Sequence, residues 1–181
     1  MKPEDPVRED LIDSLCYGEI RLPGMDEIFD QLLARINLVC VASPELDYPC
    51  LDFEGLRKFF RYALAGREEP DQVDVGAALA AFVGPAKMRW LDEIVPRRWR
   101  LGDATGFDLQ YSAETNPGEG VALSPIGTVR VSQLGGLRDH PFVCEGRVAV
   151  RLRLLNDDDS LLEETLDWSA HSARLISRSS R

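Results

Sequence analysis

The sequence predicts an α+β fold, in which an N-terminal helical half is followed by a small, mainly antiparallel β-sheet or partial barrel. Two observations lead to this prediction. Apolar residues recur at helical spacing from about residue 7 to residue 95, and after Pro96 they alternate with polar residues as in half-buried strands. The same change of period predicts a helical region over residues 1–95 and a small β-rich C-terminal domain over residues 96–181.

The helical region contains apolar stripes that predict five helices. One stripe runs from Ile28 to Ile36 and another from Leu56 to Leu64, and each places its apolar residues on a single helical face. Asp52 is suited to cap the start of the second of these helices. Three shorter helices are expected over residues 8–17, 74–83 and 86–95, and Gly84-Pro85 separates the last two.

The β-rich half begins with a clear alternation. Phe107, Leu109 and Tyr111 alternate with polar residues, which predicts a half-buried strand. Residues 128–131 form a candidate strand or the start of a short helix. Residues 113–120 are expected to be a polar loop, and residues 172–181 a polar, frayed tail.

The clearest predicted strand covers residues 147–155. Its apolar residues point to one side, while the other side carries three arginines, here called the strand arginines: Arg147, Arg151 and Arg153. The sequence Asn-Asp-Asp-Asp-Ser at residues 156–160 predicts a turn. Residues 161–166 should then return as the hairpin partner of the strand.

The negative charge is concentrated in the helical half. Residues 1–95 contain 10 Lys and Arg against 19 Asp and Glu, a net charge of −9, whereas residues 96–181 contain 11 against 12, a net charge of −1. An acidic surface repels the phosphate backbone of a nucleic acid. Any contact with nucleic acid is therefore expected in the second half.

Membrane and export signals are not found in the sequence. The longest uncharged apolar run, residues 75–83, is much shorter than the ~20 residues that a membrane helix needs. The N-terminus is polar and lacks the apolar core of a signal peptide. We therefore expect a cytoplasmic protein whose four widely spaced cysteines are reduced thiols rather than zinc ligands: Cys16, Cys40, Cys50 and Cys144.

No motif predicts that this chain is an enzyme on its own. The phosphate-binding loop G-x-x-x-x-G-K-[ST] is absent. His140 and His171 have no nucleophile motif nearby and are interpreted as structural or solvated. The acidic run Asp157–Asp159 lacks the spacing of a calcium loop and is interpreted as a solvated turn. We expect no catalytic residue, no metal, no cofactor and no small-molecule substrate.

Two basic features remain as candidate contacts for nucleic acid. The first is a basic segment of four residues: Arg97, Arg98, Trp99 and Arg100. Its guanidinium groups could bind phosphate while the indole stacks on a base. The second feature is the set of strand arginines. Each has an alternative, because Trp99 could belong to the core in period with Leu101, and Glu163 or Glu164 could pair with the strand arginines across the hairpin.

Several short motifs follow one another in a characteristic order. They are Leu91-Asp92-x-x-x-Pro96, Leu109-x-Tyr111-Ser112, Val129-Arg130-Val131, Gly136-Leu137, Gly146-Arg147-Val148, Leu152-x-Leu154-Leu155 and Thr165-x-Asp167. Over about residues 25–170, this series resembles the C-terminal region of HrpB-type bacterial DEAH-box ATP-dependent helicases. The ATPase motifs of that family lie upstream of the matched region and are absent from this sequence.

The resemblance implies an association with RNA remodelling. We expect a non-catalytic accessory region that helps an ATP-dependent RNA helicase to bind or select RNA, with the basic segment and the strand arginines as the contacts. The alternative is a protein-interaction or scaffold module, in which the acidic helical half docks a helicase core or another basic partner. The two hypotheses differ in the salt dependence of binding and in the half of the chain that carries it.

Overall fold

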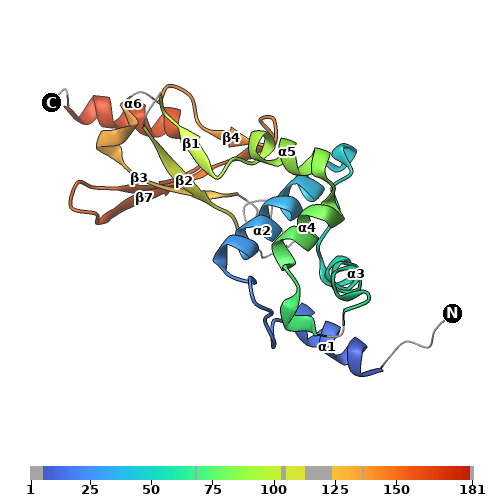
Figure 1. Cartoon of the computed structure of the whole chain (residues 1–181). Coiled ribbons are helices and arrows are strands. Elements are labelled where there is room, and N and C mark those ends of the chain that lie inside the picture. Colours follow the sequence, from blue (N-terminus) through green and yellow to red (C-terminus); the bar gives the residue numbers. More distant parts are fainter. Residues whose placement is uncertain (1–5, 68, 103–104, 113–123, 136, 180–181) are drawn as a thin grey trace. The chain divides into compact units, whose positions relative to one another are not determined.

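The computed structural model describes residues 6–67, 69–102, 105–112, 124–135 and 137–179. The chain divides into two compact units, Met1–Leu91 and Asp92–Arg181. Along the described chain, helices α1–α5 precede the strands and α6 follows them, so the predicted α+β class is confirmed (Figure 1). No described helix is long and apolar enough to cross a membrane.

The helical unit is built from the predicted helices, several of which are capped by aspartates. The bounds are α1 Pro6–Cys16, α2 Glu27–Ala42, α3 Phe53–Leu64, α4 Val75–Val83 and α5 Pro85–Ile94, with short 3₁₀ turns at Pro44–Leu46 and Pro70–Gln72. The Asp52 carboxylate accepts a hydrogen bond from the Gly55 amide at 2.8 Å, as predicted. Asp26 and Asp74 cap α2 and α4 in the same way.

The core of this unit is centred on aromatic residues of α3. Phe59 and Phe60 are fully buried, and their ring centroids lie 5.0 Å apart. Phe29 of α2 and Phe82 of α4 contact Phe59, with centroid distances of 6.3 and 5.7 Å. Because three helices meet at one ring, α3 organises the packing of the unit.

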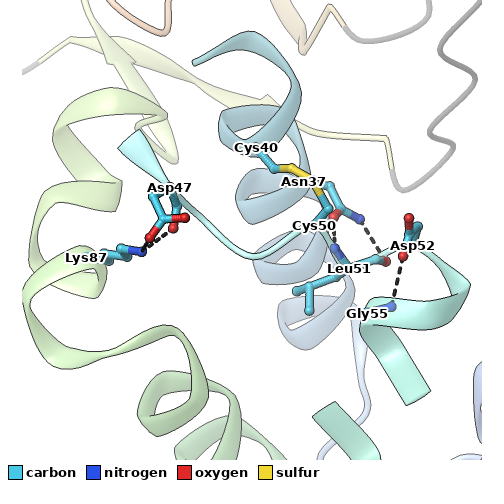
Figure 2. Close-up of a disulfide and its surroundings, with 8 residues drawn as sticks. All are labelled: Asn37, Cys40, Asp47, Cys50, Leu51, Asp52, Gly55 and Lys87. Carbon is cyan, nitrogen blue, oxygen red and sulfur yellow. Dashed lines mark hydrogen bonds and ion pairs between the residues drawn. A yellow bond between two sulfur atoms is a disulfide. The ribbon is translucent and has the colours of Figure 1, made fainter. Parts of the chain in front are cut away.

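A disulfide joins α2 to the segment that precedes α3 (Figure 2). Cys40 and Cys50 are bonded, with their Cα atoms 5.4 Å apart, so the expectation of four reduced thiols is wrong for this pair. No close cysteine motif marks this pair, but the chain turns back after α2 and brings the two residues within bridging distance. Cys16 and Cys144 are thiols, and burial raises their pKa values to about 11 and about 12.

Polar contacts fasten the same segment at two further points (Figure 2). The Asn37 side chain accepts a hydrogen bond from the Leu51 amide at 2.6 Å and donates one to the Leu51 carbonyl at 3.2 Å. Lys87 forms an ion pair with Asp47 at 3.1 Å, and the Tyr48 hydroxyl donates to the Lys87 carbonyl at 2.6 Å. The connection between α2 and α3 is therefore fixed by side chains as well as by the disulfide.

The second unit contains a five-stranded sheet in the order β1-β2-β3-β6-β7. Its strands are β1 Arg98–Arg100, β2 Gly106–Gln110, β3 Ile126–Arg130, β6 Arg151–Leu155 and β7 Leu161–Thr165. Three pairings are antiparallel and the β3–β6 pairing is parallel. The sheet is therefore mainly antiparallel. Among the described strands, β1 and β7 lie at its edges and do not pair with each other, so the sheet does not close into a barrel.

The crossover from β3 to β6 contains the remaining short elements. They are the 3₁₀ turn Val131–Leu134 and a hairpin formed by β4 Phe142–Val143 and β5 Val148–Ala149. A parallel pair needs such a long connection. β3 itself packs closely on β2, because a Cβ added at Gly127 would lie 2.3 Å from the Phe107 ring. Glycine is therefore required at this position of the sheet.

The strand predicted over residues 147–155 is interrupted in the structure. Arg147 belongs to the turn between β4 and β5, and β6 begins only at Arg151. The predicted turn and its hairpin partner are present, with β6 and β7 pairing in antiparallel register. The interruption removes Arg147 from the strand that carries Arg151 and Arg153.

The C-terminal segment forms helix α6, Trp168–Ser179, where a polar tail was expected. The helix was missed because seven of its twelve residues are polar: four serines, two arginines and one histidine. Its start is fixed by the Asp167 carboxylate, which accepts a hydrogen bond from the Ala170 amide at 3.0 Å. The predicted loop at residues 113–120 lies outside the described residues, as does Gly136 of the Gly136-Leu137 motif.

Candidate nucleic-acid interface

The basic segment lines a pocket of about 530 Å³ at one edge of the sheet. The lining residues come from the last turn of α5, the connection after it and strand β1: Asp92, Pro96, Arg97, Arg98, Trp99 and Arg100. All six belong to the second unit, because the boundary after Leu91 falls within α5. The structure therefore places the four residues of the basic segment around one hollow and adds Asp92 and Pro96 to them.

Strand β2 holds this segment in position. Trp99 is in antiparallel register with Phe107, and the Leu109 amide donates a hydrogen bond to the Arg97 carbonyl at 2.8 Å. The Tyr111 hydroxyl donates to the Pro96 carbonyl at 2.6 Å. These contacts fix the backbone on both sides of the pocket, so its side chains project from a rigid element.

The three arginines of the pocket differ in their partners. Arg98 forms an ion pair with Asp108 at 3.0 Å and donates to the Gly106 carbonyl at 2.9 Å. Arg97 lies 3.6 Å from Asp92, a looser pair in which both side chains are about two-thirds exposed, at 67% and 66%. Within the described parts of the chain, no hydrogen bond or ion pair engages the guanidinium of Arg100.

Trp99 is half-buried between two exposed arginines. Successive side chains of a strand point to opposite faces, so Trp99 shares the face of buried Phe107 and the side chains of Arg98 and Arg100 lie on the other face. The alternative that Trp99 contributes to the core is thus partly correct. Its exposed part still lines the pocket together with Pro96.

The strand arginines are not gathered in the same way. Arg153 forms an ion pair with Glu164 at 2.8 Å, and these residues are partners in the β6–β7 register. This is the cross-strand pairing that the sequence suggested as the alternative. Arg151 lies on the same interior strand, whereas Arg147 lies in the turn before β5.

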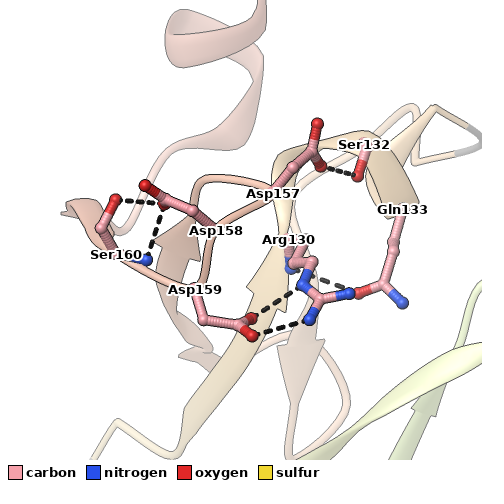
Figure 3. A network of polar contacts seen from close by, with 7 residues as sticks. All are labelled: Arg130, Ser132, Gln133, Asp157, Asp158, Asp159 and Ser160. Atoms are coloured by element: carbon pink, nitrogen blue, oxygen red, sulfur yellow. Dashed lines mark hydrogen bonds and ion pairs between the residues drawn. The ribbon is translucent and has the colours of Figure 1, made fainter.

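The acidic turn at residues 157–159 takes part in a polar network that the sequence did not reveal (Figure 3). Arg130 donates two hydrogen bonds of 2.7 Å to the Asp159 carboxylate, which raises the pKa of Arg130 and lowers that of Asp159. Ser132 donates to Asp157 at 2.6 Å, and the Ser160 amide donates to Asp158 at 3.0 Å. Asp159 therefore connects the hairpin to β3, and Asp157 connects it to the 3₁₀ turn that follows β3, whereas Asp158 stabilises the turn itself.

Both histidines connect α6 to the rest of the second unit. His140 Nδ1 accepts a hydrogen bond from the Trp168 amide at 3.0 Å, so Nε2 donates to the Val150 carbonyl at 2.8 Å. Burial lowers the pKa of His140, which favours this neutral form. His171 is buried, stacks on Trp168 and hydrogen-bonds to Glu163. In the described part of the chain, no group of three or more potential metal ligands is found.

Comparison with known proteins decides the family. A family model described as ATP-dependent helicase C-terminal (HrpB_C) matches residues 58–172, more than half of the chain. The chain belongs to this family. The match includes α4, α5, the pocket and the five-stranded sheet, so the candidate interface lies within the HrpB C-terminal region.

The relatives of this HrpB C-terminal region are much longer proteins. The ATP-dependent RNA helicase HrpB of Escherichia coli K12 is 26% identical over 147 residues, which cover 75% of this chain and 17% of that protein. A crystal structure of the E. coli DExH-box NTPase HrpB matches 82% of the chain with a TM-score of 0.66 and 21% identity. A crystal structure of the E. coli DEAH/RHA helicase HrpB matches 96% with a TM-score of 0.68 and 19% identity. The chain spans about a fifth of the length of these proteins, 19% and 22% of the two crystallised chains.

Proposed function

We propose that this chain is a non-catalytic accessory region of an ATP-dependent RNA helicase in the cytoplasm, where it assists RNA binding or substrate selection. The observation that carries the proposal is the pocket formed by the basic segment on the edge strand β1. Three guanidinium groups and one indole line the pocket, and pairing with β2 holds the backbone of β1 in place. This combination suits a phosphate backbone with an adjacent base.

Charge supports placing the contact in the second unit. The first 95 residues carry a net charge of −9, and the rest carry −1, so a polyanion is repelled less by the β-rich half. Among the described residues that line the pocket, there are three arginines and one carboxylate, that of Asp92. The strand arginines are the weaker part of the proposal, because Arg153 already pairs with Glu164. Arg100 and Arg97 are the residues we expect to contact phosphate.

The experiment that tests the proposal is a titration of labelled single-stranded RNA, followed by fluorescence anisotropy at low and physiological salt. Arg100→Glu should weaken binding, and it should lower the slope of log affinity against log salt by about one or more, as expected when a phosphate contact is lost. Arg138→Glu is the matched control, because it makes the same charge change at an exposed arginine outside the pocket. Equal effects of both variants would contradict the site, and no binding even at low salt would contradict the proposed function.

A second candidate function is a protein-interaction module formed by the helical unit. Large apolar side chains are exposed on this unit, and they include Tyr17, Ile28, Tyr62 and Trp90, the last at 61% exposure. Together with the negative charge, they suit a partner that is basic and partly apolar, such as a helicase core. Calorimetric titration with a helicase core distinguishes the two functions: Trp90→Ala should weaken this association without changing affinity for RNA.

A further inference from the structure

We infer that one face of the five-stranded sheet binds the phosphate backbone of a single-stranded RNA that crosses the strands from β1 towards β7. This inference rests on the proposed RNA-binding function and extends the interface from the edge of the sheet to its face. It follows from the register of the strands, which brings distant arginines onto one surface, and from the charge of that surface.

The buried face of the sheet is defined by the strand register. Phe107 and Leu109 of β2 are buried, and they pair with Trp99 of β1 and Gly127 of β3. Gly127 in turn pairs with Leu152 of β6, which is fully buried. Paired residues of neighbouring strands point to the same side of a sheet, and successive residues of one strand point to opposite sides. These five residues therefore share one face.

The other face of the sheet, here called the open face, collects arginines that are far apart in the sequence. Two arginines of the basic segment and two strand arginines share it, whereas Arg147 lies in the turn before β5. The described side chains on the open face are Arg98 and Arg100 of β1, Asp108 and Gln110 of β2, Ile126, Thr128 and Arg130 of β3, Arg151, Arg153 and Leu155 of β6, and Glu164 of β7.

Helix α6 packs on the buried face. Its His171 hydrogen-bonds to Glu163 of β7, and Glu163 pairs with Leu154, which is fully buried. The side chain of Glu163 thus points to the side opposite to that of its neighbour Glu164. Side chains of the open face reach solvent on all of its outer strands, and the exposed ones are Arg98, Arg100, Asp108, Gln110, Thr128, Arg130 and Glu164.

The open face is basic although the chain as a whole is acidic. Its described residues include five arginines and two carboxylates, those of Asp108 and Glu164, whereas the whole chain has a net charge of −10. One further carboxylate, that of Asp159, reaches Arg130 from the adjoining turn (Figure 3). Among these described groups, arginines still outnumber carboxylates, so the open face is complementary to a polyanion.

The ion pairs of the open face are compatible with binding of phosphate. Arg98 pairs with Asp108 at 3.0 Å, and Arg153 pairs with Glu164 at 2.8 Å. A guanidinium group has five N–H donors, so contact with one carboxylate does not exhaust its capacity. Ion pairs between exposed side chains also contribute little to stability, because water and salt screen them. A phosphate group can therefore share the arginine with the carboxylate or replace it.

The open face continues directly from the pocket. Arg98 and Arg100 line the pocket and also belong to the open face. An unpaired base that stacks on Trp99 therefore places its neighbouring phosphates beside these two arginines. The three steps from β1 to β6 span ~14 Å across the strands. Roughly four nucleotides cover this length, as in the smaller sites of other sheet surfaces that bind single strands.

Contacts on the open face should not select the base. None of its described residues is aromatic, so the face offers guanidinium groups to the backbone but no ring on which a base could stack. The open face thus supplies affinity that is sensitive to salt and independent of sequence. Any preference for a base should come from the pocket.

The test uses the full chain and labelled oligouridine of about ten nucleotides, with fluorescence anisotropy over a range of salt concentrations. Thr128→Glu places a carboxylate at the centre of the open face, where Thr128 pairs with Arg153. It should weaken binding about fivefold to tenfold, because the new charge repels the phosphates. Thr128→Gln introduces a side chain of the same size without the charge and should bind like the parent protein.

Ser169→Glu is the matched control, because it adds the same charge at an exposed residue of α6, which packs on the buried face. It should leave affinity nearly unchanged. Arg153→Gln is a second variant, and loss of its phosphate contact should lower the slope of log affinity against log salt by roughly 0.7. Thr128→Glu should weaken binding of oligoadenosine by the same factor as binding of oligouridine.

The outcomes separate this inference from the proposed function. If Arg100→Glu weakens binding while Thr128→Glu and Ser169→Glu have equal effects, the RNA stays at the pocket, so the proposed function stands and the inference is overturned. Absence of binding to every oligonucleotide at low salt overturns both. A labelled oligoglutamate of the same charge tests another occupant. If it binds as tightly as oligouridine and Thr128→Glu weakens both equally, the open face takes an acidic protein segment and the inference is overturned.

Discussion

The two units of this chain use their charged side chains differently. In the helical unit, arginines pair closely with acids of neighbouring segments: Arg57 contacts Glu9 and Asp13 at 3.0 Å each, and Arg21 contacts Asp30 at 2.8 Å. The β-rich unit also contains close pairs, such as Arg130 with Asp159 at 2.7 Å, but its Arg97 is only loosely paired with Asp92 at 3.6 Å. No hydrogen bond or ion pair among the described residues engages the guanidinium of Arg100. Basic groups that a polyanion could reach are thus gathered at the pocket.

The units also differ in how their backbones are fixed. The helical unit depends on local devices, namely aspartate caps and a disulfide that closes a short loop. The β-rich unit depends on pairings between distant strands, above all the parallel pair β3–β6. In the β-rich unit, single substitutions should therefore reduce stability most where strands pack closely. In the helical unit, they should reduce it most where a helix cap or the disulfide is lost.

The largest effect is expected at Gly127 in β3. Gly127→Ala would place a Cβ 2.3 Å from the buried ring of Phe107, and we expect a loss of about 3 kcal/mol in the free energy of unfolding. Chemical denaturation measures it. Gly135→Ala is the matched control, because no atom lies within 4 Å of the Cβ that it adds. Restoration of part of the loss by adding Phe107→Leu would show that the ring is the cause.

A smaller effect is expected from the disulfide in the helical unit. Removing the bond with Cys40→Ala and Cys50→Ala should lower the free energy of unfolding by about 2.5 kcal/mol, from the loop-closure entropy of a loop of about ten residues. The Asn37–Leu51 hydrogen bonds remain, so the fold should persist. Thermal melts with and without a reductant measure the difference. A parent protein that is insensitive to the reductant would contradict this prediction.

Local signals allowed much of this fold to be predicted from the sequence. The five helices that precede β1 were predicted because their apolar spacing, the Asp52 cap and Gly84-Pro85 all act within a few residues. The β6–β7 hairpin was predicted for the same reason. Its turn also sets the register, which is why a pairing of Glu163 or Glu164 with the strand arginines was anticipated as an alternative, and the structure shows Arg153 with Glu164.

Features that depend on distant residues could not be predicted in the same way. The Cys40–Cys50 bond, the parallel β3–β6 pair and the Arg130–Asp159 contact arise only when the chain has folded. The candidate site was found in part, because the composition of the basic segment is visible in the sequence. The participation of Asp92 and Pro96 in the pocket depends on how α5 leads into β1.

The cap of α3 provides a third and still smaller test of the local devices. Asp52→Ala removes the acceptor of the Gly55 amide and should cost about 1 kcal/mol in the free energy of unfolding. Asp52→Ser keeps a side-chain acceptor and should recover most of this loss. Urea denaturation of the three proteins checks the order. Equal stability of the Ala and Ser variants would mean that the cap contributes nothing measurable.

The smallest effect concerns stability at pH values near 6.5 and should come from the β-rich unit, which contains both histidines of the chain. The pKa of His140 is lowered by burial, although the Val150 carbonyl and the charge of Asp167 offset part of this effect. Above the ordinary pKa of 6.5, His140 is neutral in both the folded and the unfolded chain, and its hydrogen bonds to Val150 and Trp168 are intact. As the pH falls through that value, the unfolded chain binds a proton that the folded chain does not, so stability decreases until the pH reaches the lower pKa of the folded state.

An NMR titration of the imidazole resonances tests this sign directly, and His171→Gln simplifies the assignment. A His140 pKa at or above 6.5 in the folded protein would contradict the prediction. His140→Gln should remove the corresponding part of the pH dependence of unfolding. The helical unit contains no histidine. After correction for the intrinsic pH dependence of exchange, hydrogen exchange of the Trp168 amide should therefore accelerate at lower pH more than exchange of the Gly55 amide does. If both amides respond equally, the pH sensitivity is not specific to the β-rich unit.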